Sequence, residues 1–140
     1  MKGSSSLRAL PRAGLLAEAF VLAILARVAL RFLALDSVTH LMGVLPRRRL
    51  PGGQAIGACL EAAARASARV AHPTCLYRSL VALGLLARRG YPVAIHIGVS
   101  RGGGFFAHAW LTVAEHPLES PQPRAYAALW RYSPGSVRAA

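Results

Sequence analysis

The chain has 140 residues, enough for one domain with a hydrophobic core and too few for two. Apolar residues make up 54% of it and charged residues only 16%, so a membrane protein has to be considered first. The net charge of +12 comes almost entirely from arginine. The sequence has no basic stripe interleaved with aromatic residues, the pattern of proteins that bind single-stranded nucleic acid. An acidic peptide or protein is therefore a better expected partner than nucleic acid.

The first apolar stretch, Ala13–Leu35, is predicted to be a helix, with Pro11 suited to a first turn just upstream. Three charged residues interrupt it: Glu18, Arg27 and Arg31. No run of about 18 uncharged apolar residues therefore exists, and no transmembrane span is expected. We favour a core helix or a helix that docks on a partner over one that lies on a membrane surface, which stays open as the alternative. Residues 1–12 are expected to form a leading segment, disordered at its polar start, Met1–Ser6.

The two cysteines, Cys59 and Cys75, indicate neither a disulfide nor a metal site. The N-terminus makes a poor secretory signal, which favours a cytoplasmic protein without structural disulfides. The cysteines form no CxxC pair, and the spacing of His72 from Cys75 has no second matching pair. We predict neither a metal nor another cofactor.

Two further helices are predicted after a loop from Gly43 to about Gly53 that holds three consecutive arginines. The first covers roughly Gln54–Val70 and is rich in alanine. The next runs from Cys75 to Arg89, because Thr74 is a good N-cap and Gly90 a good C-terminal stop.

After Gly90 the hydrophobic period changes from 3.6 to 2, which predicts two strands, Val93–Val99 and Phe105–Val113, joined as a hairpin. A short third strand is expected around Leu118–Ser120, and the tail from Pro121 shows little pattern. Helices followed by an antiparallel sheet predict an α+β fold in one domain, residues 13–140.

Cys75 and His108 form the candidate catalytic pair. Cys75 is predicted in the first turn of a helix, where the backbone N–H groups and the helix dipole favour a thiolate and can hold an oxyanion. A nucleophile of this kind needs a base from another element, and His108 stands in mid-strand between Phe106 and Trp110. Cys59 lies in the middle of an alanine-rich helix and is interpreted as a core residue.

His96 is a second histidine in the predicted hairpin. If the turn is centred on Gly102, His96 lies directly across from His108, and cross-strand neighbours have Cβ atoms about 5 Å apart. His96 then tunes His108, contacts substrate, or is an incidental surface residue, and we favour the last of these.

Three segments together resemble one family. They are Cys75-Leu-Tyr-Arg-Ser-Leu80 at a helix start, Arg88-Arg89-Gly90 at its end, and Phe106-Ala-His108-Ala-Trp110 in a strand. This combination is similar to the transglutaminase-like lasso-peptide leader peptidases, in the stand-alone form without a leader-recognition domain. The resemblance implies a papain/transglutaminase-like fold and a cysteine peptidase that removes the leader from a ribosomally made lasso-peptide precursor.

The same resemblance implies two protein partners, a separate leader-recognition protein and an asparagine-synthetase-like cyclase. It also implies a third catalytic residue, because the family's pattern has an Asp about twelve residues after the histidine. Here Ser120 stands at that position, with Glu119 beside it. Glu119 is our predicted third member, Ser120 is the alternative, and a Cys-His dyad is also open.

Two other functions stay open at this point. One is a non-catalytic peptide-binding or scaffold subunit of the same maturation complex, which binds the precursor without thiol reactivity at Cys75. The other is a different transglutaminase-fold thiol enzyme, an amidase or acyltransferase, which reacts at Cys75 but ignores a lasso precursor.

Overall fold

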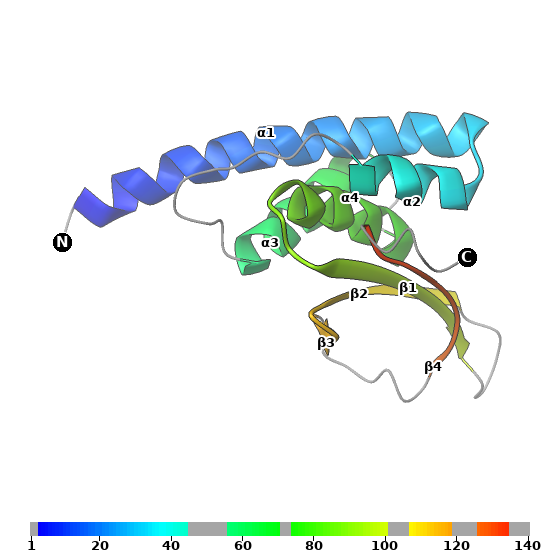
Figure 1. Cartoon of the computed structure of the whole chain (residues 1–140). Coiled ribbons are helices and arrows are strands. Elements are labelled where there is room, and N and C mark those ends of the chain that lie inside the picture. The colour runs from blue at the N-terminus through cyan, green and yellow to red at the C-terminus, as the bar shows by residue number, and fades with distance from the viewer. Residues whose placement is uncertain (1–2, 45–55, 71–73, 101–106, 119–125, 135–140) are drawn as a thin grey trace.

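A computed structural model describes residues 3–44, 56–70, 74–100, 107–118 and 126–134, with side chains from residue 14 onward except those of residues 100 and 126. Helices come first and strands follow, which confirms the predicted α+β architecture (Figure 1). The elements are α1 (Gly3–Phe32), α2 (Leu35–Val44), α3 (Ile56–Val70), α4 (Cys75–Arg88), β1 (Val93–Ser100), β2 (Ala107–Val113), β3 (His116–Pro117) and β4 (Tyr126–Tyr132).

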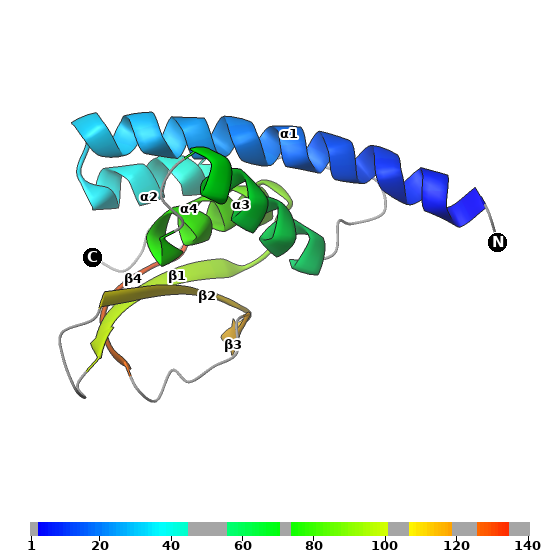
Figure 2. The same ribbon diagram turned by 180° about the vertical axis from the view of Figure 1, so that it is seen from behind.

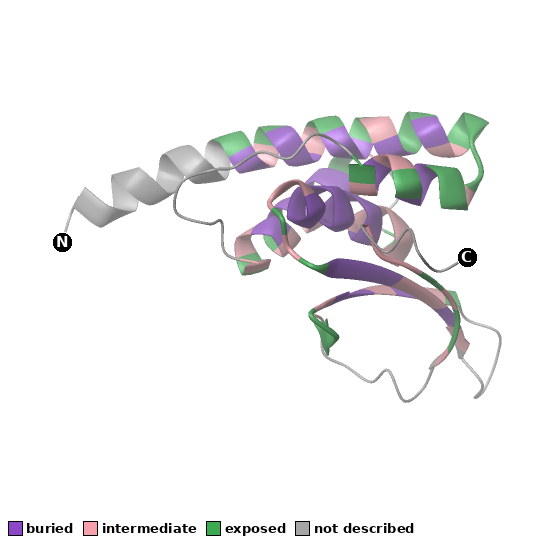
Figure 3. Ribbon diagram, in the orientation of Figure 1, coloured by how far each residue is buried: buried purple, intermediate pink, exposed green. Residues whose placement is uncertain are grey.

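Helix α4 lies at the centre of the domain, between the other helices and the sheet (Figures 1 and 2). Every residue from Ser79 to Ala87 is buried, which a helix achieves only when neighbours cover all its sides (Figure 3). As predicted, Thr74 caps it: the Thr74 side chain accepts a hydrogen bond from the backbone N–H of Tyr77. Gly90 ends the helical path with a positive φ of 83°, a conformation that glycine adopts without strain.

The helical layer has one more helix than predicted, and its first helix is longer. Helix α1 begins at Gly3, so the disordered start predicted for Met1–Ser6 is wrong from Gly3 onward, and Pro11 lies within the helix. Leu, Arg and Ala between Leu7 and Leu10 are strong helix formers and extend the helix upstream. Helix α2 was not predicted; the chain turns after Phe32 and packs α2 beside α4.

Helix α1 is a core helix on one face. Its buried residues recur at helical spacing, and they pack on α3 and α4: Leu15, Ala19, Leu22, Ala23, Ala26 and Ala29. The opposite face is exposed, including Val21, Ile24, Val28 and Phe32. Within the part of the chain that the structure describes, no helix combines the length and apolar character needed to cross a bilayer.

A buried ion pair joins α1 to the end of α4. The Glu18 carboxylate accepts a hydrogen bond from Arg88 and is held by both terminal nitrogens of Arg89, with Nη2–Oε2 at 2.7 Å and Nη1–Oε1 at 3.1 Å. The side chains of Glu18 and Arg89 are only 7% and 4% exposed. Glu18, whose charge interrupts the apolar sequence, is therefore a partner in an ion pair inside the fold.

The sheet is antiparallel, with strand order β3-β2-β1-β4. The predicted hairpin is present as β1 and β2, and β1 lies in the centre of the sheet. Strand β4 falls in the tail that was predicted to lack pattern, and this prediction is wrong. A register shift opposite Ile97 and Gly98 leaves Leu129 without a partner, and such a bulge hides the two-residue period in the sequence.

Candidate active site

Cys75 is the first residue of α4, as predicted, and it is half-buried. Its position in the first turn of α4 sets it beside the backbone N–H groups of a helix N-terminus. Cys59 is 0% exposed in the middle of α3, and burial raises the pKa of its thiol, against the opposing effect of Arg89. The structure confirms Cys59 as a core residue and leaves Cys75 as the accessible thiol.

The start of α4 makes two hydrogen bonds to one residue of β2, Ala109. The backbone N–H of Ala109 points at the Cys75 sulfur, with N and Sγ 3.4 Å apart. One turn further along α4, the Ser79 hydroxyl donates to the Ala109 carbonyl oxygen at 3.3 Å. The side chains of Cys75 and Ser79 lie on one face of α4 and thus bind the backbone N–H and the backbone carbonyl of Ala109.

These contacts use the edge of β2 that faces away from β1. The backbone N–H of Leu118 donates to the carbonyl of Leu111, so Leu111 directs its backbone groups to that edge. In an antiparallel ladder alternate residues share the same side, so Ala109 directs its groups there too. Among the described residues, β3 pairs only with Thr112 and Val113, which leaves the edge at Ala109 to α4.

The contact at Ala109 brings the backbone of His108 near Cys75. Its Cα is two covalent bonds from the Ala109 nitrogen, and so within about 6 Å of the Cys75 sulfur. The two residues lie 33 positions apart in the sequence, and the predicted elements alone did not specify their distance. The structure thus places the backbone of His108 near the Cys75 sulfur, and it stacks the His108 imidazole on the ring of Trp110.

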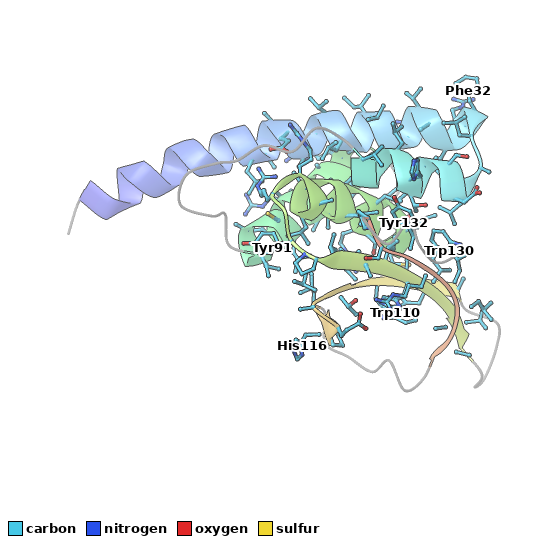
Figure 4. All side chains as sticks on the ribbon, in the orientation of Figure 1. Phe32, Tyr91, Trp110, His116, Trp130 and Tyr132 are labelled. Carbon is cyan, nitrogen blue, oxygen red and sulfur yellow. The ribbon has the colours of Figure 1, made fainter. Side chains whose placement is uncertain are left out.

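Three rings form a stack on the sheet face turned away from the helices. The ring of Trp110 is stacked on that of His108, with centroids 6.0 Å apart, and on that of His96, with centroids 5.4 Å apart. Figure 4 shows Trp110 on this face, whereas Trp130 and Tyr132 lie on the helix side of the sheet. The stack limits the orientations that the His108 imidazole can take.

The predicted pairing of His96 with His108 is wrong. The observed register pairs His96 with Trp110, and Gly98 with His108, because the connection between the strands is centred one residue later than assumed. Gly98 leaves room for the indole: a Cβ there would lie 2.9 Å from Trp110 and 2.6 Å from the Ala127 carbonyl oxygen. The indole therefore lies between the two imidazoles.

The environment of His96 favours the neutral form of its imidazole. Its Nε2 is hydrogen-bonded to the Thr112 hydroxyl at 2.9 Å. Burial, followed by the positive charge of Arg131, lowers the pKa of His96 below its ordinary 6.5, and Glu115 acts in the opposite direction. Arg131 and Glu115 are themselves paired.

We expect His96 to make the fold less stable in mild acid. Its pKa is lower folded than unfolded, so its contribution is complete above pH 6.5 and is lost as the pH falls towards the folded pKa. Urea unfolding at about pH 7.5 and about pH 5.5 measures this loss in the wild type and in His96→Gln. The loss should be smaller in His96→Gln, and equal losses in both proteins would contradict the prediction.

The predicted third members, Glu119 and Ser120, lie outside the described residues. Leu118 is the last described residue before them, and its N–H bond to Leu111 holds it beside β2. The short third strand is described as His116–Pro117, two residues upstream of the predicted start.

Other features of the described residues do not indicate a different active site. Among the described residues, no group of three or more His, Cys, Asp or Glu side chains is placed to hold a metal. A groove of about 500 Å³ lies between α1 and α3, lined by Leu16, Phe20, Arg65, Ala68 and Arg69. Neither Cys75 nor His108 lines it.

Sequence reasoning did not identify Ser79 or Gly98 as residues of this region. The spacing of Cys75 and Ser79, one helical turn apart, was a usable signal that both face the same way. Nothing local in the sequence indicated that this face meets β2.

Comparison with known proteins gives one match. The family model of the transglutaminase-like superfamily matches residues 15–131, which includes most of the described helices and strands. No curated protein and no solved structure matches the chain.

Proposed function

Because this chain belongs to the transglutaminase-like superfamily, whose domains are typically cysteine-type peptidases and transferases, we propose that it is a cysteine peptidase that removes the leader from a lasso-peptide precursor. The observation that carries the enzymatic part is the contact between the Ala109 N–H and the Cys75 sulfur. It supports the pair because it brings the strand that carries His108 to a thiol at a helix N-terminus, and a cysteine nucleophile requires a base from another element.

In the proposed reaction, His108 takes the proton of the Cys75 thiol, and the sulfur attacks the carbonyl carbon at the leader–core junction. The N–H groups of the first turn of α4 stabilise the oxyanion that forms. His108 then protonates the leaving amine of the core, which leaves the leader as a thioester on Cys75. His108 deprotonates a water molecule, the resulting hydroxide attacks the thioester, and the leader departs as a carboxylic acid while the thiol is restored.

The choice of a lasso-peptide precursor as substrate rests on the motifs at residues 75–80, 88–90 and 106–110. Two of these motifs meet in the candidate site, because the first begins with Cys75 and the last contains His108 and Trp110. The proposal includes a separate leader-recognition protein and an asparagine-synthetase-like cyclase as partners, and a cytoplasmic location. The net charge of +12 favours an acidic substrate or partner.

Glu119 is the proposed group that orients His108, and Ser120 is the alternative. An orienting group fixes the imidazole tautomer and stabilises the imidazolium that forms during the reaction.

The first experiment is mass spectrometry of a candidate precursor incubated with this protein and its recognition partner. We expect two products whose masses add up to the precursor plus one water, which identifies hydrolysis. Glu119→Gln should slow this reaction, and Ser120→Ala serves as the matched comparison. An adduct with an added amine would instead indicate an acyltransferase. An intact precursor, together with a Cys75 that resists iodoacetamide, would indicate a scaffold subunit.

A further inference from the structure

Ser79 makes a hydrogen bond that other buried hydroxyls of the described helices do not make. Ser67 donates to the carbonyl of Ala64, and Thr39 to those of Leu35 and Asp36, so both bond within their own helix. This is the usual behaviour of helical Ser and Thr. The Ser79 hydroxyl instead leaves its helix and donates to Ala109, 30 residues away, while the residue is only 3% exposed.

The receiving residue, Ala109, follows His108 directly. Its carbonyl accepts from Ser79 and its N–H points at Cys75, so α4 binds this strand residue at two points. A buried carbonyl that loses its donor is costly, and the strand can regain a partner only by moving. Any such movement changes the position of His108 relative to the sulfur.

We propose that Ser79 is a positioning residue that keeps His108 in place through the whole reaction, an inference that rests on the proposed peptidase function. The two hydrogen bonds that α4 makes to Ala109 differ in how they respond to acylation of Cys75. A thiolate sulfur is a good acceptor for the Ala109 N–H, but the sulfur of a thioester has lost its negative charge and accepts only weakly. Once Cys75 is acylated, the hydrogen bond from the Ala109 N–H to the sulfur is weakened, and the Ser79–Ala109 hydrogen bond persists.

Ser79 therefore matters most for the second half of the reaction. His108 must then stay close to the thioester to deprotonate the incoming water, while the contact through the Cys75 sulfur is weakened. Loss of the hydroxyl should slow deacylation more than acylation, so the acyl-enzyme accumulates.

The test compares Ser79→Ala with Ser67→Ala, a matched variant that removes a hydroxyl buried to the same degree but bonded within its own helix. Ser79→Ala is expected to lower kcat by about 10- to 100-fold, because small displacements of a catalytic group have effects of this size. Its leader thioester on Cys75 should be visible by intact-protein mass spectrometry of the quenched reaction. Ser67→Ala should turn over like the wild type, without accumulation.

Two substrate-independent measurements separate this inference from the proposed function. Hydrogen exchange of a peptide covering residues 107–113 should be faster in Ser79→Ala than in Ser67→Ala, and iodoacetamide should label Cys75 about tenfold more slowly. If these changes appear but the wild type leaves the precursor intact, the function is wrong and Ser79 still positions β2. Wild-type exchange and labelling in Ser79→Ala, or equal losses in both serine variants, would overturn the inference.

Discussion

Cys75→Ala is expected to abolish cleavage of the precursor, whereas Cys59→Ala leaves it intact. Only the Cys75 sulfur lies at a helix start beside the strand that carries His108. Removing the nucleophile of a hydrolase costs about 10⁶-fold in kcat, which takes the rate below detection. The rate of core release, followed by mass spectrometry for both variants and the wild type, measures this effect.

Iodoacetamide labelling of the folded wild type provides an independent check on the same pair of thiols. Cys59 is 0% exposed and burial raises its pKa, so both access and ionisation protect it. We expect one label per molecule at neutral pH, on Cys75. Cleavage by Cys75→Ala at the wild-type rate, or labelling of Cys59 in the folded protein, would contradict this assignment of roles.

Glu18→Gln is expected to destabilise the fold by about 3–5 kcal/mol, the usual effect of removing one partner of a buried ion pair. The substitution removes the negative charge that faces the buried guanidinium of Arg89 and the mostly buried guanidinium of Arg88. Such a loss is a large fraction of the total stability of a small domain. Urea unfolding followed by circular dichroism measures it.

Glu61→Gln is the matched control for Glu18→Gln. Glu61 pairs with Arg65 one turn away on α3, but the two side chains are 55% and 66% exposed. A solvent-exposed pair of this kind contributes about 0.3–0.5 kcal/mol. Equal losses of stability in the two variants would show that burial does not strengthen the role of Glu18.

Local signals were sufficient for the elements that carry the candidate site. The cap at Thr74 and the stop at Gly90 lie within a few residues of the backbone groups that they satisfy, so they predicted α4 correctly. The two-residue alternation similarly predicted β1 and β2, because it depends only on neighbours along the strand. The resemblance in the motifs around Cys75 and His108 indicated the superfamily that the family model then matched.

Two elements, β4 and α2, were not predicted because their sequence patterns are irregular or weak. Strand β4 contains a bulge at Leu129, which shifts the faces of the residues on either side and removes the regular alternation. Helix α2 is only ten residues long and is stabilised by packing against α4, so its own sequence is a weak indicator.

The sequence by itself determined the helix that starts at Cys75, the hairpin that contains His108 and the α+β order of the elements. The tertiary structure decided how these parts meet: Gly98 rather than His96 faces His108, and Ser79 binds Ala109. It also decided that Glu18 binds Arg88 and Arg89, residues 70 and 71 positions away. The physical reason is range, since caps and periodicity act over a few residues, whereas strand register and buried pairs depend on groups that come together only when the core forms.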